Sequence, residues 1–127
     1  MCHQTVSLAA RHLEANGIPT VVFGCARDIV EHCGVPRFVF SDFPLGNPTG
    51  RPFDAAMQRE VVGLGLQLLE TAPRPGTTVV NPHEWSPDPS WKDKIFSKEQ
   101  PFLSEDAKEK WLKRKDAYRE LKGSGKV

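Results

Sequence analysis

The apolar residues nearest the start of the chain repeat at helical spacing. Between polar neighbours they follow an i, i+3, i+4, i+7 pattern, carried by Val6, Ala9, Ala10 and Leu13. The pattern predicts an amphipathic helix that starts directly after Cys2 and ends at Asn16-Gly17, because glycine readily closes a helix. We expect the apolar stripe of this helix to face the core.

Short β-branched or aromatic runs alternate with further helical patterns along the rest of the chain. Runs of this composition predict strands over 18–23, 37–41 and 77–80. The spacing of apolar residues predicts helices over 26–33 and 53–71, with Pro52 in the first turn of the second. Gly63 and Gly65 lie inside that helix, where glycine more often permits close packing than marks a site.

This alternation predicts an α/β fold with a partial parallel sheet of about three strands and helices on its faces. Right-handed crossovers are expected to place successive helices on those faces. The arrangement suggests a Rossmann-like or flavodoxin-like half-domain. Because a helix comes before any strand, we expect the first strand of the sheet to be lost or supplied by another chain.

The last quarter of the chain differs in composition from the rest. From Lys92 onward there are 11 Lys and Arg against 7 Asp and Glu, so residues 92–127 carry a net charge of +4. We expect a charged helix from about Ser104, where the serine serves as N-cap. The expected division is a domain over 1–91 and a charged helical tail over 92–127, with Trp85 and Trp91 pinning the connecting strap to the body.

Composition narrows the classes of partner and environment. The net charge of +1 gives no strong field for nucleic acid, and no apolar run reaches the length of about 20 residues needed to cross a membrane. The chain opens without a signal-peptide pattern, so we expect a cytoplasmic protein without nucleic-acid or membrane partners. Three cysteines in such a chain do not suggest a disulfide framework.

Two segments are placed where chemistry occurs in an open parallel sheet, at the carboxyl ends of strands. One is the run Cys2, His3, Gln4 and Thr5, which opens the first helix. The other is the proline- and glycine-rich loop from Asp42 to Arg51. We expect the two to face each other across one crevice, with Cys2 as the catalytic residue and a substrate-binding set of His3, Gln4, Thr5, Asp42, Gly46, Asn47, Gly50 and Arg51.

The thiol of Cys2 has a physical reason to be reactive. Unpaired N–H groups and the dipole at a helix N-terminus favour a thiolate over a thiol. The alternative is that Cys2 is a frayed terminal residue without a partner. Cys25 and Cys33 are more simply interpreted as small buried hydrophobic residues, although Cys25 also lies near a helix start. The spacing of Cys and His residues matches no zinc motif, and no nucleotide-binding glycine motif follows a strand, so we expect neither a metal nor another cofactor.

Several motifs in this chain resemble the selenoprotein B family, the substrate-specific subunits of glycine, sarcosine, betaine and D-proline reductases. The first motif block is Cys2-His3-Gln4-Thr5-Val6, followed by Gly17-Ile18-Pro19-Thr20-Val21. The second is Asp42-Phe43-Pro44-Leu45-Gly46-Asn47-Pro48, followed by Gly50-Arg51-Pro52. The resemblance covers about residues 2–91 and is greatest to short, cysteine-containing members of the family.

The resemblance implies reductive cleavage of a small amine or amino acid by a dithiol/disulfide couple, with a thioredoxin-like reductant. Cys2 matches the second cysteine of the family's redox motif, and the partner thiol or selenol would lie before Met1. We therefore expect the C-terminal half of the family domain, inactive by itself. The alternative is a non-catalytic binding or assembly module that docks on a separate N-terminal half or forms a homo-oligomer.

Overall fold

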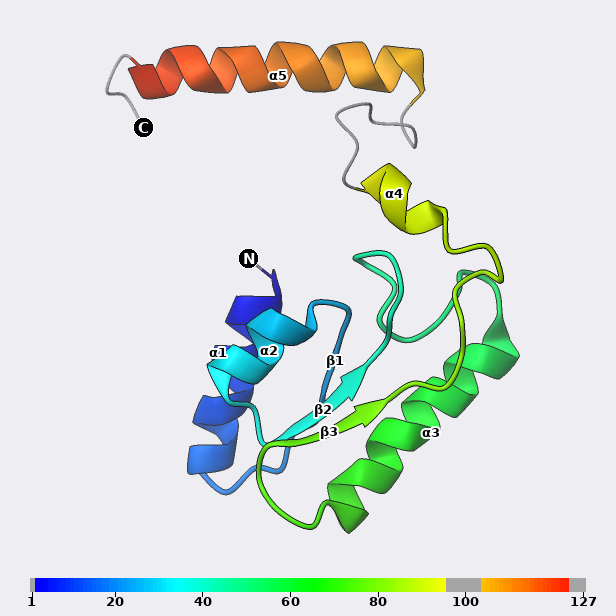
Figure 1. Cartoon of the computed structure of the whole chain (residues 1–127). Helices are drawn as coiled ribbons and strands as arrows, with labels where there is room; N and C mark the ends of the chain where they lie inside the picture. The colour runs from blue at the N-terminus through cyan, green and yellow to red at the C-terminus, as the bar shows by residue number, and fades with distance from the viewer. Residues whose placement is uncertain (1, 96–103, 124–127) are drawn as a thin grey trace. The chain divides into compact units, whose positions relative to one another are not determined.

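The computed structural model describes residues 2–95 and 104–123 (Figure 1). The described residues form two compact units that divide after Pro87. The first unit contains three helices and three strands: α1 (Cys2–Ala15), β1 (Val22–Gly24), α2 (Arg27–Cys33), β2 (Arg37–Phe40), α3 (Ala55–Thr71) and β3 (Thr77–Val80). The second contains α4 (Trp91–Ile95) and α5 (Glu105–Gly123).

The three strands form one parallel sheet in the order β1-β2-β3. Val22 pairs with Phe38 in the first ladder, and Phe38 pairs with Thr78 in the second. The predicted α/β class and the three-stranded parallel sheet are therefore confirmed. The first strand is shorter than predicted, since the residues from Ile18 to Val21 approach the sheet before pairing begins.

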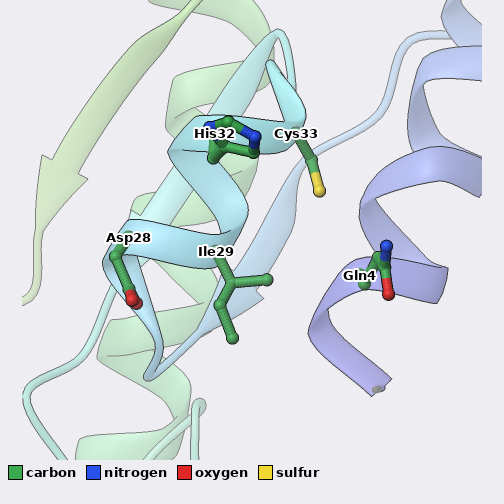
Figure 2. A pocket seen from close by; sticks show the side chains of 5 residues that line it. All are labelled: Gln4, Asp28, Ile29, His32 and Cys33. Carbon is green, nitrogen blue, oxygen red and sulfur yellow. The ribbon is translucent and has the colours of Figure 1, made fainter.

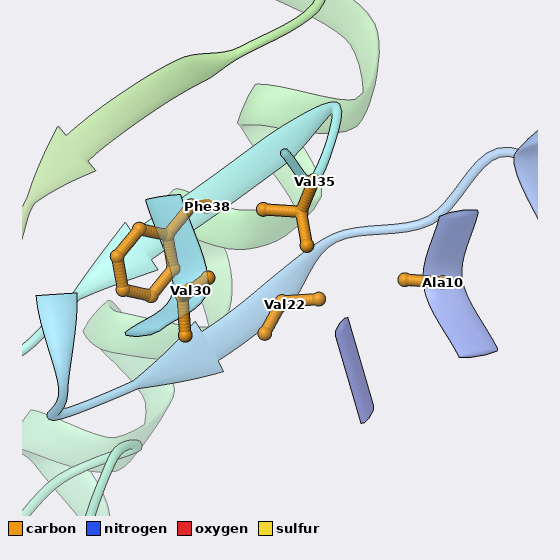
Figure 3. Close-up of a cluster of buried hydrophobic side chains, with 5 residues drawn as sticks. All are labelled: Ala10, Val22, Val30, Val35 and Phe38. Atoms are coloured by element: carbon orange, nitrogen blue, oxygen red, sulfur yellow. The ribbon is translucent and has the colours of Figure 1, made fainter. Parts of the chain in front are cut away.

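Alternate side chains of β2 build a core on each face of the sheet. Phe38 packs with α1 and α2 in a cluster of Ala10, Val22, Val30, Val35 and Phe38 (Figure 3). Val39 points to the opposite face and packs with α3 in a cluster of Val39, Phe43, Met57, Val61 and Leu68. Helices therefore cover both faces, with α1 and α2 on one side and α3 on the other (Figure 1).

The two crossovers between strands have opposite hands. Both connections advance by one strand in the same direction across the sheet, yet α2 and α3 lie on opposite faces. One of them therefore departs from the right-handed arrangement that parallel β-α-β units almost always adopt. The 14 residues between Phe40 and Ala55 supply ample chain for the passage from the sheet to α3.

The predicted buried stripe of α1 is largely wrong. Ala10 is buried as expected, but Val6 and Leu13 are 46% and 39% exposed. The side of α1 that faces the sheet instead carries His3, Ser7 and Ala10. Ser7 is fully buried, and its hydroxyl is satisfied there because it donates to the His3 carbonyl at 2.6 Å. A satisfied serine can occupy a core position that hydrophobicity alone would not assign to it.

Helix α3 starts later than its apolar pattern predicted. Pro52 lies before the helix and not in its first turn, and Asp54 is the N-cap, accepting the Met57 N–H at 3.1 Å. Within the helix, Gly65 permits the expected close packing: an added Cβ would lie 2.1 Å from Cζ of the Phe23 ring. At Gly63, by contrast, nothing lies within 4 Å of such a Cβ.

A polar cluster ties the end of α1 to the start of β2. The Glu14 carboxylate accepts the Thr20 N–H at 2.5 Å and contacts Arg37 Nη1 at 2.6 Å. Burial by itself raises the pKa of Glu14, but the hydrogen bonds from Thr20 and the charge of Arg37 outweigh it, so the pKa is lowered from its ordinary value of 4.5. The cluster therefore stabilises the fold while Glu14 is ionised.

The second unit contains the predicted charged helix. Ser104 is the N-cap of α5, accepting the Ala107 N–H at 3.3 Å, as expected. The short helix α4 was not predicted, since the sequence suggested an irregular strap there. Trp85 packs against Phe43 in the first unit, with ring centroids 5.5 Å apart, whereas Trp91 belongs to the second unit. No helix within the described ranges is long and apolar enough to cross a membrane.

We predict that Glu14→Gln lowers the free energy of unfolding by about 1–2 kcal/mol at pH 7, because a charge-assisted hydrogen bond is lost. The lowered pKa means that the unfolded chain binds this proton more readily, so the stabilisation is lost as pH falls through the folded pKa. Urea titrations at pH 7 and pH 3 should show a smaller wild-type advantage at pH 3 than at pH 7. Glu109→Gln, in an exposed pair with Lys113, is the control and should change little. An equal deficit at both pH values would contradict a charge-based role.

We also predict opposite effects for the two helical glycines. Gly65→Ala should destabilise the chain by about 1–2 kcal/mol, because overpacking against Phe23 outweighs the gain in helix propensity. Gly63→Ala, its matched control, should stabilise the chain by about 0.5–1 kcal/mol. Urea denaturation of both variants gives the comparison. Equal stability of the two variants would mean that the Phe23 ring moves aside freely.

Candidate functional site

The first turn of α1 lies at the carboxyl end of β1. His3 packs there so closely that a Cβ at Gly24 would lie 3.0 Å from its Cδ2 atom. Nε2 of His3 accepts the Cys25 backbone N–H at 3.1 Å. Two contacts of the His3 ring therefore hold the first turn of α1 at the carboxyl end of β1.

The contact with Cys25 fixes the protonation pattern of a neutral His3. A backbone N–H can only donate, so Nε2 must be the unprotonated ring nitrogen and Nδ1 carries the proton. Nδ1 lies 3.5 Å from the Cys2 sulfur. Cys2 itself is exposed in the first turn of α1. The arrangement directs an N–H donor, together with the positive end of a helix dipole, toward an accessible sulfur.

The loop after β2 approaches the same strand from the other side. Backbone N–H groups of Phe43 and Asn47 interact with the Cys25 thiol. Burial raises the pKa of this thiol, the charge of Asp42 adds to the rise, and the two N–H groups only partly oppose it. Cys25 is half-buried, and its raised pKa makes the thiolate less accessible than in an exposed cysteine. It links the two predicted segments, since its N–H contacts His3 and its side chain contacts the loop.

Cys25 does not share a face of the sheet with Cys2. Its side chain packs against the buried cluster that contains Val39 on the α3 face, whereas His3 lies against Gly24 on the α1 face. Successive side chains along a strand point to opposite faces, which separates the two sulfurs. Cys33 lies elsewhere, at the end of α2, where its carbonyl accepts a hydrogen bond from Arg11.

Buried polar groups hold the loop in place. The Ser41 hydroxyl donates to the Pro48 carbonyl at 2.7 Å and accepts from Asn81 Nδ2 at 3.1 Å. Asn81 Oδ1 in turn accepts the His83 N–H at 3.1 Å. Ser41 and Asn81 are both buried, so these hydrogen bonds join the ends of β2 and β3 to the loop. Neither residue was singled out from the sequence, although Ser41 is the last residue of one predicted strand and Asn81 directly follows another.

The remaining predicted site residues lie on α1 and in the loop after β2. Arg51 pairs with the helix cap Asp54 at 3.0 Å, and its carbonyl accepts from Gln58. Gly50 lies tightly against Gln58, whereas nothing lies within 4 Å of an added Cβ at Gly46. Thr5 is exposed on α1. The substrate-binding roles of these residues stay predictions.

Gln4 is turned away from His3 and faces α2. It lines a surface pocket of 490 Å³ together with Asp28, Ile29, His32 and Cys33 (Figure 2). Four consecutive residues of a helix point in four directions, about 100° apart, so the run from Cys2 to Thr5 cannot converge on one point. The prediction from the sequence nevertheless assigned His3, Gln4 and Thr5 to one substrate-binding set.

Phe53, which lies between β2 and α3, was not singled out from the sequence. It is fully exposed and has a φ of +64°, a left-handed conformation that non-glycine residues rarely adopt. No group of three or more His, Cys, Asp or Glu side chains suited to a metal ion occurs in the described ranges 2–95 and 104–123.

Part of the chain is similar in sequence to a protein named as a reductase subunit. It is 31% identical over 84 residues to a protein named D-proline reductase subunit gamma from Acetoanaerobium sticklandii, and the match covers 66% of this chain. The chain spans only 35% of the length of that relative. No protein-family profile matches the chain, and no solved structure matches it significantly. The chain is thus a distant and partial relative of a reductase subunit. The resemblance to the selenoprotein B family in particular stays a prediction.

We predict that Ser41→Ala destabilises the chain by about 1–3 kcal/mol, because the buried Asn81 amide loses its acceptor. The same variant should speed proteolysis within residues 42–51, since Pro48 loses its anchor. Thr71→Ala removes an exposed hydroxyl that donates to the Gln67 carbonyl and is the control. Urea denaturation and limited proteolysis supply the two measurements. Wild-type cleavage rates in the Ser41 variant would contradict the anchoring role.

Proposed function

We propose that this chain is a thiol-dependent reductase component of the selenoprotein B type, with Cys2 as its redox-active residue. The observation that carries the proposal is the accessible Cys2 sulfur beside Nδ1 of His3, whose other nitrogen is held by the Cys25 N–H. The similarity to a protein named D-proline reductase subunit gamma supports the reaction class.

The chemistry proposed is a two-electron reductive cleavage of a C–N bond in a small amine or amino acid. One thiolate attacks the carbon of the C–N bond, so a C–S bond forms as the C–N bond breaks, and the leaving nitrogen takes one thiol proton. The second thiolate then attacks the bound sulfur, which forms the disulfide and breaks the C–S bond, and the carbon takes the other proton. Cys2 supplies one of the two sulfurs, and a thioredoxin-like dithiol regenerates the thiols by exchange. The second thiol or selenol comes from a partner polypeptide, since Cys25 faces the other side of the sheet.

His3 acts as a positioning residue in this proposal. Its Nδ1 lies beside the Cys2 sulfur, so that its N–H can hold the reacting sulfur in position by a hydrogen bond. Gly24 makes this placement possible, because any larger residue would push against the imidazole. The loop from Asp42 to Arg51, with Gly46, Asn47 and Gly50, forms the substrate lip beside the same strand end.

We predict that Cys2 alkylates faster than both Cys25 and Cys33 at pH 7. Cys25 should react more slowly than Cys33, because burial raises the pKa of the Cys25 thiol. His3→Ala should slow Cys2 alkylation about threefold to tenfold, since an exposed hydrogen bond to a thiolate contributes about 0.5–1.5 kcal/mol. Iodoacetamide labelling followed by peptide mass spectrometry gives the three rates separately.

His12→Ala is the matched control for this experiment, because His12 is an exposed histidine on the same helix. It should leave all three rates unchanged. A Cys2 that labels no faster than Cys33 would overturn the proposed role of Cys2. Equal slowing by the two histidine variants would overturn the role of His3.

A further inference from the structure

The outer edge of β1 is unpaired within the part of the chain that the structure describes. β1 pairs with β2 alone, and the Gly24 carbonyl accepts the Ser41 N–H on that side. Backbone groups of successive strand residues point to opposite sides, so the N–H and C=O of Phe23 face the free edge. Such an edge is a ready template for another strand.

Helix α1 presents an apolar stripe beside this edge. Gln4 and Arg11 mark the flank of α1 that faces α2. The opposite flank carries the outer α1 stripe, which consists of Val6, Ala9 and Leu13 and is exposed along its length. Because α2 lies over β2 and β3, with Glu31 bonded to Thr78, this flank faces away from the sheet's interior and toward the free edge of β1.

Helix α3 presents a second apolar stripe at the same edge, on the other face of the sheet. Glu60 pairs with His83, which follows β3, and so marks the flank of α3 near the far edge. The opposite flank carries Val62 and Leu66, which are 40% and 60% exposed. Gly65, between the buried and exposed flanks, touches Phe23 of β1.

The free edge is thus bordered by uncovered apolar side chains on both faces of the sheet. A strand added there would be covered by α1 from one side and by α3 from the other, which is the environment of strands in parallel sheets. After Phe23, the next N–H group that faces the free edge belongs to Cys25, and His3 already accepts it. An added strand could therefore pair with β1 only as far as Gly24. The residues after a parallel strand would then lie beside Cys2.

We propose that this edge docks a polypeptide segment corresponding to the part of D-proline reductase subunit gamma outside the matched region. The segment adds a strand parallel to β1 and buries the outer α1 stripe together with Val62 and Leu66. Most of that relative's length lies outside the match, which supplies ample chain for such a strand. The inference rests on the proposed function, because a parallel strand would bring its carboxyl end, and a second redox group, to Cys2.

The test uses the unmatched part of that relative, produced as a separate polypeptide, as the probe. It is mixed with the 127-residue chain carrying Cys2→Ser, so that docking is measured without thiol chemistry. We expect a one-to-one complex in sedimentation experiments, with slower hydrogen exchange at the Phe23 amide. Val6→Asp and Leu66→Asp should each weaken the complex about tenfold or more, because a charge is buried in an apolar contact.

Val80→Asp is the matched control, since Val80 is similarly exposed but lies on β3 at the other edge of the sheet. It should leave the complex unchanged, and circular dichroism of the free variants checks their folding. Absence of a complex with the probe would overturn the inference, as would a complex that tolerates both edge variants. A homodimer of the chain alone with a protected Phe23 amide would assign the edge to a second copy instead. Failure of docking leaves the Cys2 alkylation result unaffected, which separates the two proposals.

Discussion

The strand β2 is the constraint on which the first unit depends. It is the central strand of the sheet, and its successive side chains, Phe38 and Val39, enter different cores. Phe38 joins α1 and α2 to the sheet, whereas Val39 joins α3 to it. Each buried side chain of this size contributes about 1.5–3 kcal/mol through removal from water. One short strand therefore holds both helical layers in place.

The same strand also determines where the candidate site forms. Its carboxyl end continues into Ser41, which is buried and bonded to Pro48 and Asn81. The loop is thereby held over β1, where its N–H groups contact Cys25. The carboxyl ends of the strands carry a half-buried thiol, Cys25, whose pKa is raised by burial, and an accessible thiol, Cys2, at the first turn of α1. The difference between the two thiols follows from their surroundings alone.

A sheet of three strands leaves apolar surface that its own helices cannot cover. The outer α1 stripe and the Val62–Leu66 flank of α3 border the free edge of β1 from opposite faces. Scattered exposed hydrophobic residues are ordinary, but two stripes that flank one unpaired strand edge are typical of an interaction surface.

The sequence by itself determined the order of elements in the first unit, the parallel sheet and the charged helix, because apolar periodicity and glycine or proline breakers report local structure directly. It also located Cys2 and the loop from Asp42 at strand ends. Only the tertiary structure decided which residues of α1 are buried, since Ser7 satisfies its hydroxyl within the helix while Val6 faces an uncovered edge. Only contacts between distant segments placed His3 against Gly24 and turned Gln4 toward α2. Side-chain direction and the face that each crossover takes depend on packing across the whole sheet, which no local pattern encodes.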